Sequence, residues 1–189
     1  MTTVLSDTER AFLSSAVDAL IPADDLSPSG SACGVVDFIE RQLAGPWGQG
    51  ARLYRDGPFL QGKPEQGYQL GLTPRELIAA GIAAADAWTR GVYGKDFAQL
   101  ADTDRTAALT ALENGTAAFP EFSSTDFFEA LLTLAMEGFF ADPIHGGNRD
   151  CASWKMIGYP GQPANYRDAV ERYFGKRYDQ PPRSLADLS

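Results

Sequence analysis

The spacing of apolar residues constrains the fold of this chain more than any other feature of its sequence. In six segments these residues recur every three or four positions, as they do on one face of an α-helix. No run of alternating apolar and polar residues is long enough to predict a sheet. The predicted helices cover residues 6–21, 35–44, 73–94, 102–115, 124–140 and 167–174. We therefore expect an all-α fold, a single domain of about six helices that spans residues 1–189.

Local signals mark the ends of two of these helices. Ser6 and Glu9 have the spacing of a capping box, and Pro22 ends the helix that they begin. The segment Thr73–Glu76 combines a cap, a proline at the first helical position and an acidic third residue. Gly94 is suited to end that helix. The first and third helices therefore have defined starts and ends.

The fourth and fifth helices carry less specific signals. Asp102 or Thr103 is expected to cap the fourth helix, and Ser124 or Thr125 is expected to cap the fifth. The fifth helix is the most hydrophobic segment of the chain. Such wide apolar coverage predicts a central helix that other helices nearly surround.

Two long irregular stretches interrupt the helices. The first stretch, Gly45–Leu72, has seven glycines and three prolines in 28 residues, and the second stretch is Asp142–Tyr166. Both interleave aromatic residues with turn formers, which favours ordered loops that a core or a partner covers. The last helix is expected to turn Val170 and Tyr173 inward, and the tail from about residue 179 to lie extended on a surface.

The charge of the chain limits its partners. Asp and Glu total 25 against 16 Lys and Arg, which gives a formal net charge of −9. An acidic chain repels nucleic-acid phosphates and anionic membrane surfaces, so neither is an expected partner. No apolar run approaches the roughly 20 residues of a membrane-spanning helix. The N-terminus shows no basic leader before an apolar segment, so no signal peptide is expected.

The metal-ligating residue types do not form a recognisable site. Cys33 and Cys151 have no second Cys or His at zinc-site spacing. They are either small buried thiols or members of a disulfide, within the chain or with a partner, in an oxidising compartment. Asp142, His145 and Asp150 would make at best a poor metal site. The sequence therefore predicts no metal centre.

Reactive side chains are densest between Glu137 and Lys155. His145, the only histidine, could act as a general base with Asp142 or Glu137, but a hydrogen-bonded loop histidine is the favoured interpretation. No serine or cysteine nucleophile stands in a suitable context beside it. The chain also has no dinucleotide-binding, phosphate-loop or haem-attachment motif. The segment therefore holds no self-contained catalytic site.

The glycines that follow the histidine suggest a second interpretation. Gly146 and Gly147 could present backbone N–H groups to an anion, with Asn148 and Arg149 as further donors. However, Arg149 beside Asp150 is more typical of an ion pair that pins the loop than of a substrate clamp. A small-ligand site here remains an alternative.

Several motifs together resemble one known family. The run MEGFFADPIHGGNRD, Met136–Asp150, precedes WKMIGYPG, Trp154–Gly161. Upstream segments agree: LSDTERAFLSSAVDALIPADD, GVVDFIERQLAGPWGQGARLYRDGPF and PEQGYQLGLTPREL. On these motifs, from about Leu5 to Tyr178, the chain resembles the gluconate 2-dehydrogenase subunit 3 family.

The resemblance implies a division of labour between subunits. Family members are small subunits of sugar and polyol dehydrogenases, whose large subunit, of the glucose-methanol-choline type, holds FAD and performs the hydride chemistry. A cytochrome c subunit with haem c often receives the electrons. The small subunit has no known cofactor and serves maturation, stability or export of the catalytic chain. The implied location is periplasmic or inner-membrane-associated, or cytoplasmic if the chain has no leader.

For such a subunit, both irregular stretches are expected to form the partner interface. The first stretch contributes Trp47, Tyr54 and Phe59. The second stretch and the helix end before it contribute Phe140, Asp142, Pro143, His145, Gly146, Gly147, Asn148, Arg149, Asp150, Trp154, Lys155 and Tyr159. No catalytic, cofactor-binding or metal residue is predicted in this chain. The alternatives are a stand-alone enzyme with His145 as general base and a sugar-acid-binding module.

Overall fold

The computed structural model describes residues 4–60, 62–63, 66–161 and 166–188, and this part of the chain contains seven α-helices and no strand. The α-helices are α1 (Asp7–Leu20), α2 (Val35–Ala44), α3 (Pro74–Tyr93), α4 (Asp102–Glu113), α5 (Ser124–Phe140), α6 (Ala152–Ile157) and α7 (Arg167–Tyr173). Short 3-10 helices are η2 (Phe97–Gln99), η3 (Pro143–His145), η4 (Arg149–Cys151) and η5 (Leu185–Leu188). The predicted all-α class is confirmed, and only α6 among the α-helices has no counterpart in the prediction.

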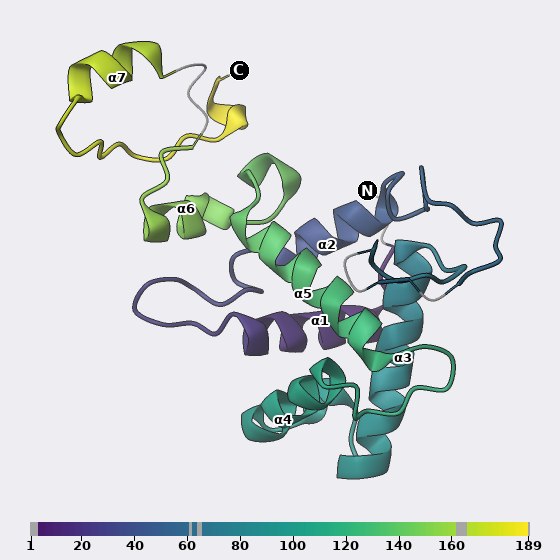
Figure 1. The fold of residues 1–189 in the computed structure, drawn as a ribbon. Helices are drawn as coiled ribbons and strands as arrows, with labels where there is room; N and C mark the ends of the chain where they lie inside the picture. The colour runs from purple at the N-terminus through teal and green to yellow at the C-terminus, as the bar shows by residue number, and fades with distance from the viewer. Residues whose placement is uncertain (1–3, 61, 64–65, 162–165, 189) are drawn as a thin grey trace.

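Helix α5 lies at the centre of the fold, with α1, α2, α3 and α4 arranged around it (Figure 1). Phe127 of α5 is fully buried, and its ring centroid lies 6.0 Å from that of Phe12 in α1. Phe12 in turn stacks at 4.5 Å on Phe97 of η2. A Cβ atom at Gly81 of α3 would lie 2.0 Å from the Phe127 ring, so α3 approaches α5 closely only because this residue is glycine. Aromatic packing around Phe127 therefore joins four elements into one core.

The predicted caps of α1 and α3 are confirmed. The Ser6 hydroxyl accepts a hydrogen bond from the backbone N–H of Glu9, whose carboxylate accepts one from the backbone N–H of Ser6. Thr73 and Glu76 form the same reciprocal pair at the start of α3. Gly94 ends α3 in the left-handed conformation, at a φ of 72°. Local sequence signals therefore fix the start of α1 and both ends of α3.

The predicted caps of α4 and α5 are wrong. Ala101 precedes α4 and supplies no side-chain cap, so Asp102 is the first helical residue instead. Ser123 caps α5, and its hydroxyl accepts a hydrogen bond from the backbone N–H of Thr125. Ser124 is buried inside the helix, where its hydroxyl donates to a carbonyl oxygen of α4 at 3.1 Å. This contact between helices selects the cap from three adjacent hydroxyl residues.

The expectation that other helices nearly surround α5 is also wrong. One face of this helix is open to solvent over several turns. Its exposed residues include two large apolar side chains, Leu132 and Met136, together with Glu129, Thr133 and Glu137. In the described part of the chain, no helix buries these side chains.

Residues 166–188 form an arm that carries α7 away from the other helices (Figure 1). The predicted inward orientation of Val170 is wrong, since its side chain is 62% exposed. Tyr173 packs on Tyr178 within the arm, with ring centroids 4.9 Å apart, rather than on the core. Helical periodicity identifies an apolar face, but it does not show whether another element covers that face.

Candidate functional site

Asn148 organises the second stretch from a fully buried position. Its Nδ2 donates to the Ala141 carbonyl oxygen at 2.9 Å, and its Oδ1 accepts from the backbone N–H and the hydroxyl of Ser153 at 2.9 and 2.8 Å. Asn148, Asp150 and Cys151 all have left-handed backbones, with φ values of 46°, 57° and 54°. Each such residue costs on the order of 1 kcal/mol. The Asn148 hydrogen bonds hold the chain in this strained path.

Trp154 is the second internal anchor of this stretch. It is 4% exposed, and its Nε1 donates to the Phe140 carbonyl oxygen at 2.9 Å. Its ring meets that of Tyr159 edge-on, with centroids 5.0 Å apart. Asn148 and Trp154 are both among the predicted interface residues, but their side chains lie inside this chain. They hold the backbone of the second stretch in place, but they do not themselves lie on its surface.

Arg149 pins the second stretch to α2 and the turn before it. One guanidinium nitrogen donates to the Ala32 carbonyl oxygen at 3.0 Å, and another lies 3.3 Å from the Asp37 carboxylate. The Asp37 carboxylate also lies 3.3 Å from Arg10 of α1. The loop-pinning ion pair expected for Arg149 therefore exists, but its partner is Asp37 and not the adjacent Asp150.

Asp142 ties the arm to the second stretch. Its carboxylate accepts hydrogen bonds from the Ser184 hydroxyl at 2.6 Å, the Leu185 backbone N–H at 2.9 Å and the Ile144 backbone N–H at 3.0 Å. Burial opposes ionisation of this carboxyl, but the hydrogen bonds outweigh that effect and hold the pKa of Asp142 below its usual value. Because these groups engage the carboxylate, Asp142 is not arranged to orient the exposed His145 as a base.

The two glycines after the histidine serve the packing of the loop. The backbone N–H of Gly146 donates to the Pro143 carbonyl oxygen at 3.0 Å, which closes the η3 turn. A Cβ atom at Gly147 would lie 2.0 Å from the Gly138 carbonyl oxygen, so the loop approaches α5 there only as glycine. The Gly146 N–H and the Arg149 guanidinium therefore already have acceptors within the chain.

Cys33 and Cys151 are free and buried in this structure. Burial raises the pKa of both thiols. The structure therefore supports buried thiols over a disulfide within the chain.

Three aromatic residues of the first stretch are exposed. Trp47 is 47% exposed, Tyr54 is 66% exposed and Phe59 is 38% exposed. The Tyr54 hydroxyl donates to the Gly57 carbonyl oxygen at 2.9 Å, which fixes the ring while leaving its face in water. No α-helix forms in the described part of this stretch. The first stretch thus presents an apolar surface that the described residues do not bury.

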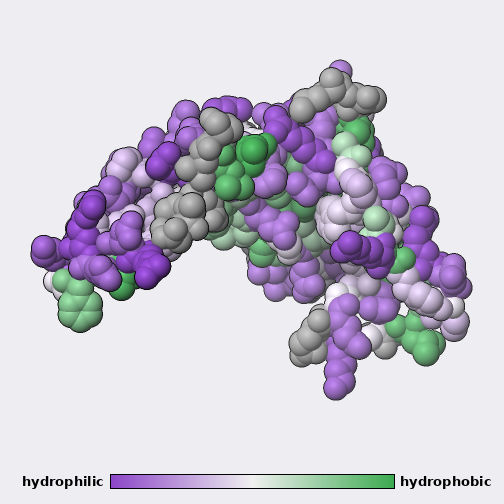
Figure 2. Space-filling model, turned by 90° about the horizontal axis from the view of Figure 1, so that it is seen from above, coloured by the Kyte–Doolittle hydropathy of each residue, from purple (hydrophilic) through white to green (hydrophobic). Residues whose placement is uncertain are grey.

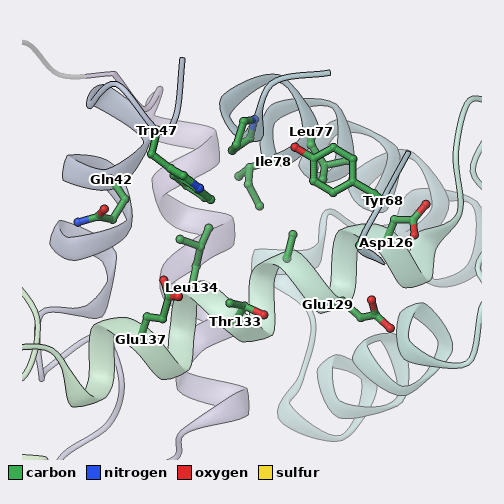
Figure 3. A pocket seen from close by; sticks show the side chains of 13 residues that line it. Gln42, Trp47, Tyr68, Leu77, Ile78, Asp126, Glu129, Thr133, Leu134 and Glu137 are labelled. Atoms are coloured by element: carbon green, nitrogen blue, oxygen red, sulfur yellow. The ribbon is translucent and has the colours of Figure 1, made fainter. Parts of the chain in front are cut away.

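A groove of about 510 Å³ lies between the first stretch and the open face of α5. Figure 3 shows Trp47 and Tyr68 on opposite sides of this groove, above the side chains of α5. Its lining residues are Gln42, Trp47, Gly67, Tyr68, Pro74, Leu77, Ile78, Asp126, Glu129, Ala130, Thr133, Leu134 and Glu137. Only Trp47 belongs to the predicted interface. The groove joins α2, the first stretch, α3 and α5, so no single run of sequence encodes it.

The model of the family described as gluconate 2-dehydrogenase subunit 3 matches residues 7–161. This chain belongs to the gluconate 2-dehydrogenase subunit 3 family. Membership supports a small subunit of a dehydrogenase complex. Searches of curated proteins and of solved structures give no significant match. The matched region contains the first stretch, the groove and residues 142–161 of the second stretch, and it ends before the arm.

The fifteen predicted interface residues of this subunit-3 chain differ in accessibility. Seven are exposed: Trp47, Tyr54, Phe59, His145, Arg149, Asp150 and Lys155. Five are half-buried: Phe140, Asp142, Pro143, Gly146 and Tyr159. Three are buried: Gly147, Asn148 and Trp154. The predicted set therefore combines surface residues with residues that hold the surface in place.

Two further properties of the described residues bear on the chemistry of this family member. Within them, no three His, Cys, Asp or Glu side chains are grouped so that they could hold a metal ion. None of the described helices has the combination of length and hydropathy needed to traverse a lipid bilayer.

Proposed function

We propose that this chain is the non-catalytic small subunit that binds the FAD-containing catalytic subunit of a sugar or sugar-acid dehydrogenase complex. In this role it stabilises the catalytic chain and helps it to mature or to be exported. The proposal goes beyond family membership, because the family supports a small subunit without identifying its partner or its task. A gluconate 2-dehydrogenase or a sugar 3-dehydrogenase type of complex is the proposed setting.

The observation that carries this proposal is the apolar surface that the first stretch leaves uncovered. Trp47, Tyr54 and Phe59 hold large apolar areas in water. Exposed aromatic residues are enriched in protein interfaces, where they frequently dominate the binding energy. A partner that covers them would remove an unfavourable exposure which the isolated chain retains.

The two alternative functions receive less support from the geometry. A general base needs a group that orients it, and the Asp142 carboxylate beside His145 is engaged by Ser184 and Leu185 instead. An anion site needs free donors, whereas the Gly146 N–H and the Arg149 guanidinium already have acceptors within the chain.

The partner chemistry and the location are also proposals. The catalytic subunit is proposed to be of the glucose-methanol-choline type with FAD, and a third subunit to carry haem c. This chain itself is proposed to hold no cofactor. The complex is proposed to be periplasmic or associated with the inner membrane through its other subunits. These proposals rest on the family resemblance alone.

Co-purification tests the proposed function directly. The small subunit, carrying an affinity tag, is co-expressed with its FAD-containing subunit and captured, and the flavin absorbance per captured chain is measured. We expect wild type to carry flavin and the Tyr54→Ala/Phe59→Ala variant to carry about tenfold less, because aromatic residues at interface centres have effects of this size. The chain expressed alone should be colourless and should not oxidise sugars.

Val92→Ala is the matched control for this experiment. Val92 is 56% exposed at the far end of α3, outside the first stretch, so its removal should leave the captured flavin unchanged. Wild-type chains that capture no flavoprotein would contradict the proposal. Flavin or turnover in a preparation of this chain alone would contradict it as well.

A further inference from the structure

A row of carboxylates on α5 lines the groove. Asp126, Glu129 and Glu137 occupy one face of the helix, with Thr133 between the last two. Figure 3 shows these side chains following one another along α5 beneath Trp47 and Tyr68. A helix rises about 1.5 Å per residue, so the row extends over about 16 Å. The groove therefore has an acidic side of considerable length.

These carboxylates have no cationic partner within the described chain. None of its ion pairs involves Asp126, Glu129 or Glu137. By contrast, Glu9 on α1 is paired with Arg75 at 2.7 Å. Burial raises the pKa of Asp126 and of Glu137, which means that their surroundings do not compensate the charge. A cation entering the groove would supply that compensation.

The remaining sides of the groove are aromatic and apolar. Leu77, Ile78 and Leu134 form a buried floor, and Trp47 and Tyr68 stand above it from opposite sides. Aromatic faces attract ammonium and guanidinium groups, whose hydrocarbon stems can cover apolar surface. Carboxylates, aromatic rings and an apolar floor together match the side chains of lysine and arginine. They do not match a negatively charged group.

The apolar surface continues outside the groove on the same helix. Leu132 and Met136 are 36% and 43% exposed and lie beside Glu129 on the helix surface. An occupant that contacts the whole row must be about 16 Å long, which corresponds to about three turns of helix or five residues of strand. A small amine is too short to reach both ends of the row, whereas a peptide segment is long enough.

We propose that this groove receives a cationic amphipathic segment of the catalytic subunit, with Lys or Arg side chains on the α5 carboxylates and apolar side chains on the floor. The inference rests on the proposed function, because it names the part of the partner that the small subunit recognises. The net charge of −9 favours encounter with a basic segment, and the carboxylate row fixes its register.

A competition experiment tests the groove. The catalytic subunit, carrying the affinity tag, is co-expressed with equal amounts of wild-type small subunit and of Glu129→Lys/Glu137→Lys. The captured complex is analysed by intact-mass measurement. Like charges brought together at an interface oppose binding, so we expect the variant to be under-represented by about tenfold or more.

Glu113→Lys/Glu121→Lys is the matched control. It changes the net charge by the same amount at two exposed positions outside the groove, and it should compete with wild type to within about twofold. Thermal unfolding of both variants establishes that they fold. Glu129→Gln/Glu137→Gln removes the charges without reversing them, and its smaller deficit should shrink further in high salt, because salt screens charge pairs.

The outcomes separate the groove from the proposed function. If wild type joins the complex and Glu129→Lys/Glu137→Lys competes equally, the groove proposal is wrong while the proposed function stands. An equal deficit of Glu113→Lys/Glu121→Lys in the captured complex would also overturn the groove proposal. The net charge of the chain, and not the position of the carboxylates, would then determine binding. Self-association of the isolated chain that the groove variant abolishes would assign the groove to a second copy instead. If no small subunit joins the catalytic chain, the proposed function itself fails.

Discussion

The two irregular stretches have similar compositions but different structures. Both are rich in glycine, proline and aromatic residues. The second stretch folds into η3, η4 and α6 around the buried side chains of Asn148 and Trp154. The first stretch forms no α-helix in its described part and leaves Trp47 and Tyr54 in solvent. The second stretch therefore packs partly into the interior of the fold, whereas the first stretch stays on the surface.

Internal hydrogen bonding explains this difference. In the second stretch, Asn148 satisfies a carbonyl oxygen and a serine, and Trp154 satisfies a second carbonyl oxygen. These bonds allow the backbone to be buried, because buried polar groups need partners. Figure 2 shows the outcome at the surface, a mainly hydrophilic face with separate apolar patches, some of them on the arm at the left. An exposed apolar patch on this chain is therefore informative about a partner.

The largest expected contrast is between the two tryptophans. Trp154→Ala should lower the free energy of unfolding by about 4 kcal/mol, because it empties a buried site and leaves the Phe140 carbonyl oxygen without its donor. The melting temperature should fall by about 10 °C. Trp47→Ala should cost less than about 1 kcal/mol, since nearly half of that side chain is in water. Calorimetry of the isolated chain measures both, and equal losses would break the distinction between the stretches.

A smaller contrast is expected between two amide side chains. Asn148→Ala leaves the Ala141 carbonyl oxygen and the Ser153 hydroxyl unsatisfied, so it should lower the free energy of unfolding by about 3 kcal/mol. Gln66 of the first stretch accepts one exposed hydrogen bond from the Lys63 backbone, and Gln66→Ala should change stability by less than about 0.5 kcal/mol. Urea unfolding gives both values. A loss below about 1 kcal/mol for Asn148→Ala would show that the Asn148 hydrogen bonds are not needed to hold the second stretch.

The parts of this fold that were predictable depend on contacts close in sequence. The capping boxes at Ser6 and Thr73 could be read directly, because their donors and acceptors are three residues apart. The short helix α6 could not be found by periodicity, because its six residues are fewer than two full turns. The Ser123 cap depends on a bond from Ser124 to α4, which no local pattern contains.

The candidate site was predictable only in part for the same reason. Exposed aromatic residues such as Tyr54 could be found in the sequence, because an aromatic residue in a glycine-rich loop is unusual there. The groove could not, because Trp47 and Tyr68 of the first stretch meet Glu137 of α5 only in the folded chain. The burial of Asn148 could not be inferred either, since polar residues are normally exposed and its partners are set by tertiary structure.

The smallest expected effect is on amide exchange in the arm. It concerns Asp142, whose hydrogen bonds hold the arm to the second stretch. Its pKa is lowered in the folded chain, so its hydrogen bonds to Ser184 and Leu185 are at full strength above pH about 4 and are lost as the pH falls through the lowered pKa. Asp142→Asn should therefore raise amide exchange at Leu185 by about tenfold at pH 7, which corresponds to about 1.4 kcal/mol.

Comparing the two proteins at each pH tests this prediction, because intrinsic exchange rates then cancel. The difference at Leu185 should be full at pH 7 and should disappear well below pH 4, where wild type also carries a neutral side chain at Asp142. Asp56→Asn in the first stretch is the control, since this exposed side chain is far in sequence from the arm and should leave exchange at Leu185 unchanged. A difference that persisted undiminished at low pH would mean that the shape of the Asp142 side chain, and not its charge, holds the arm to the second stretch.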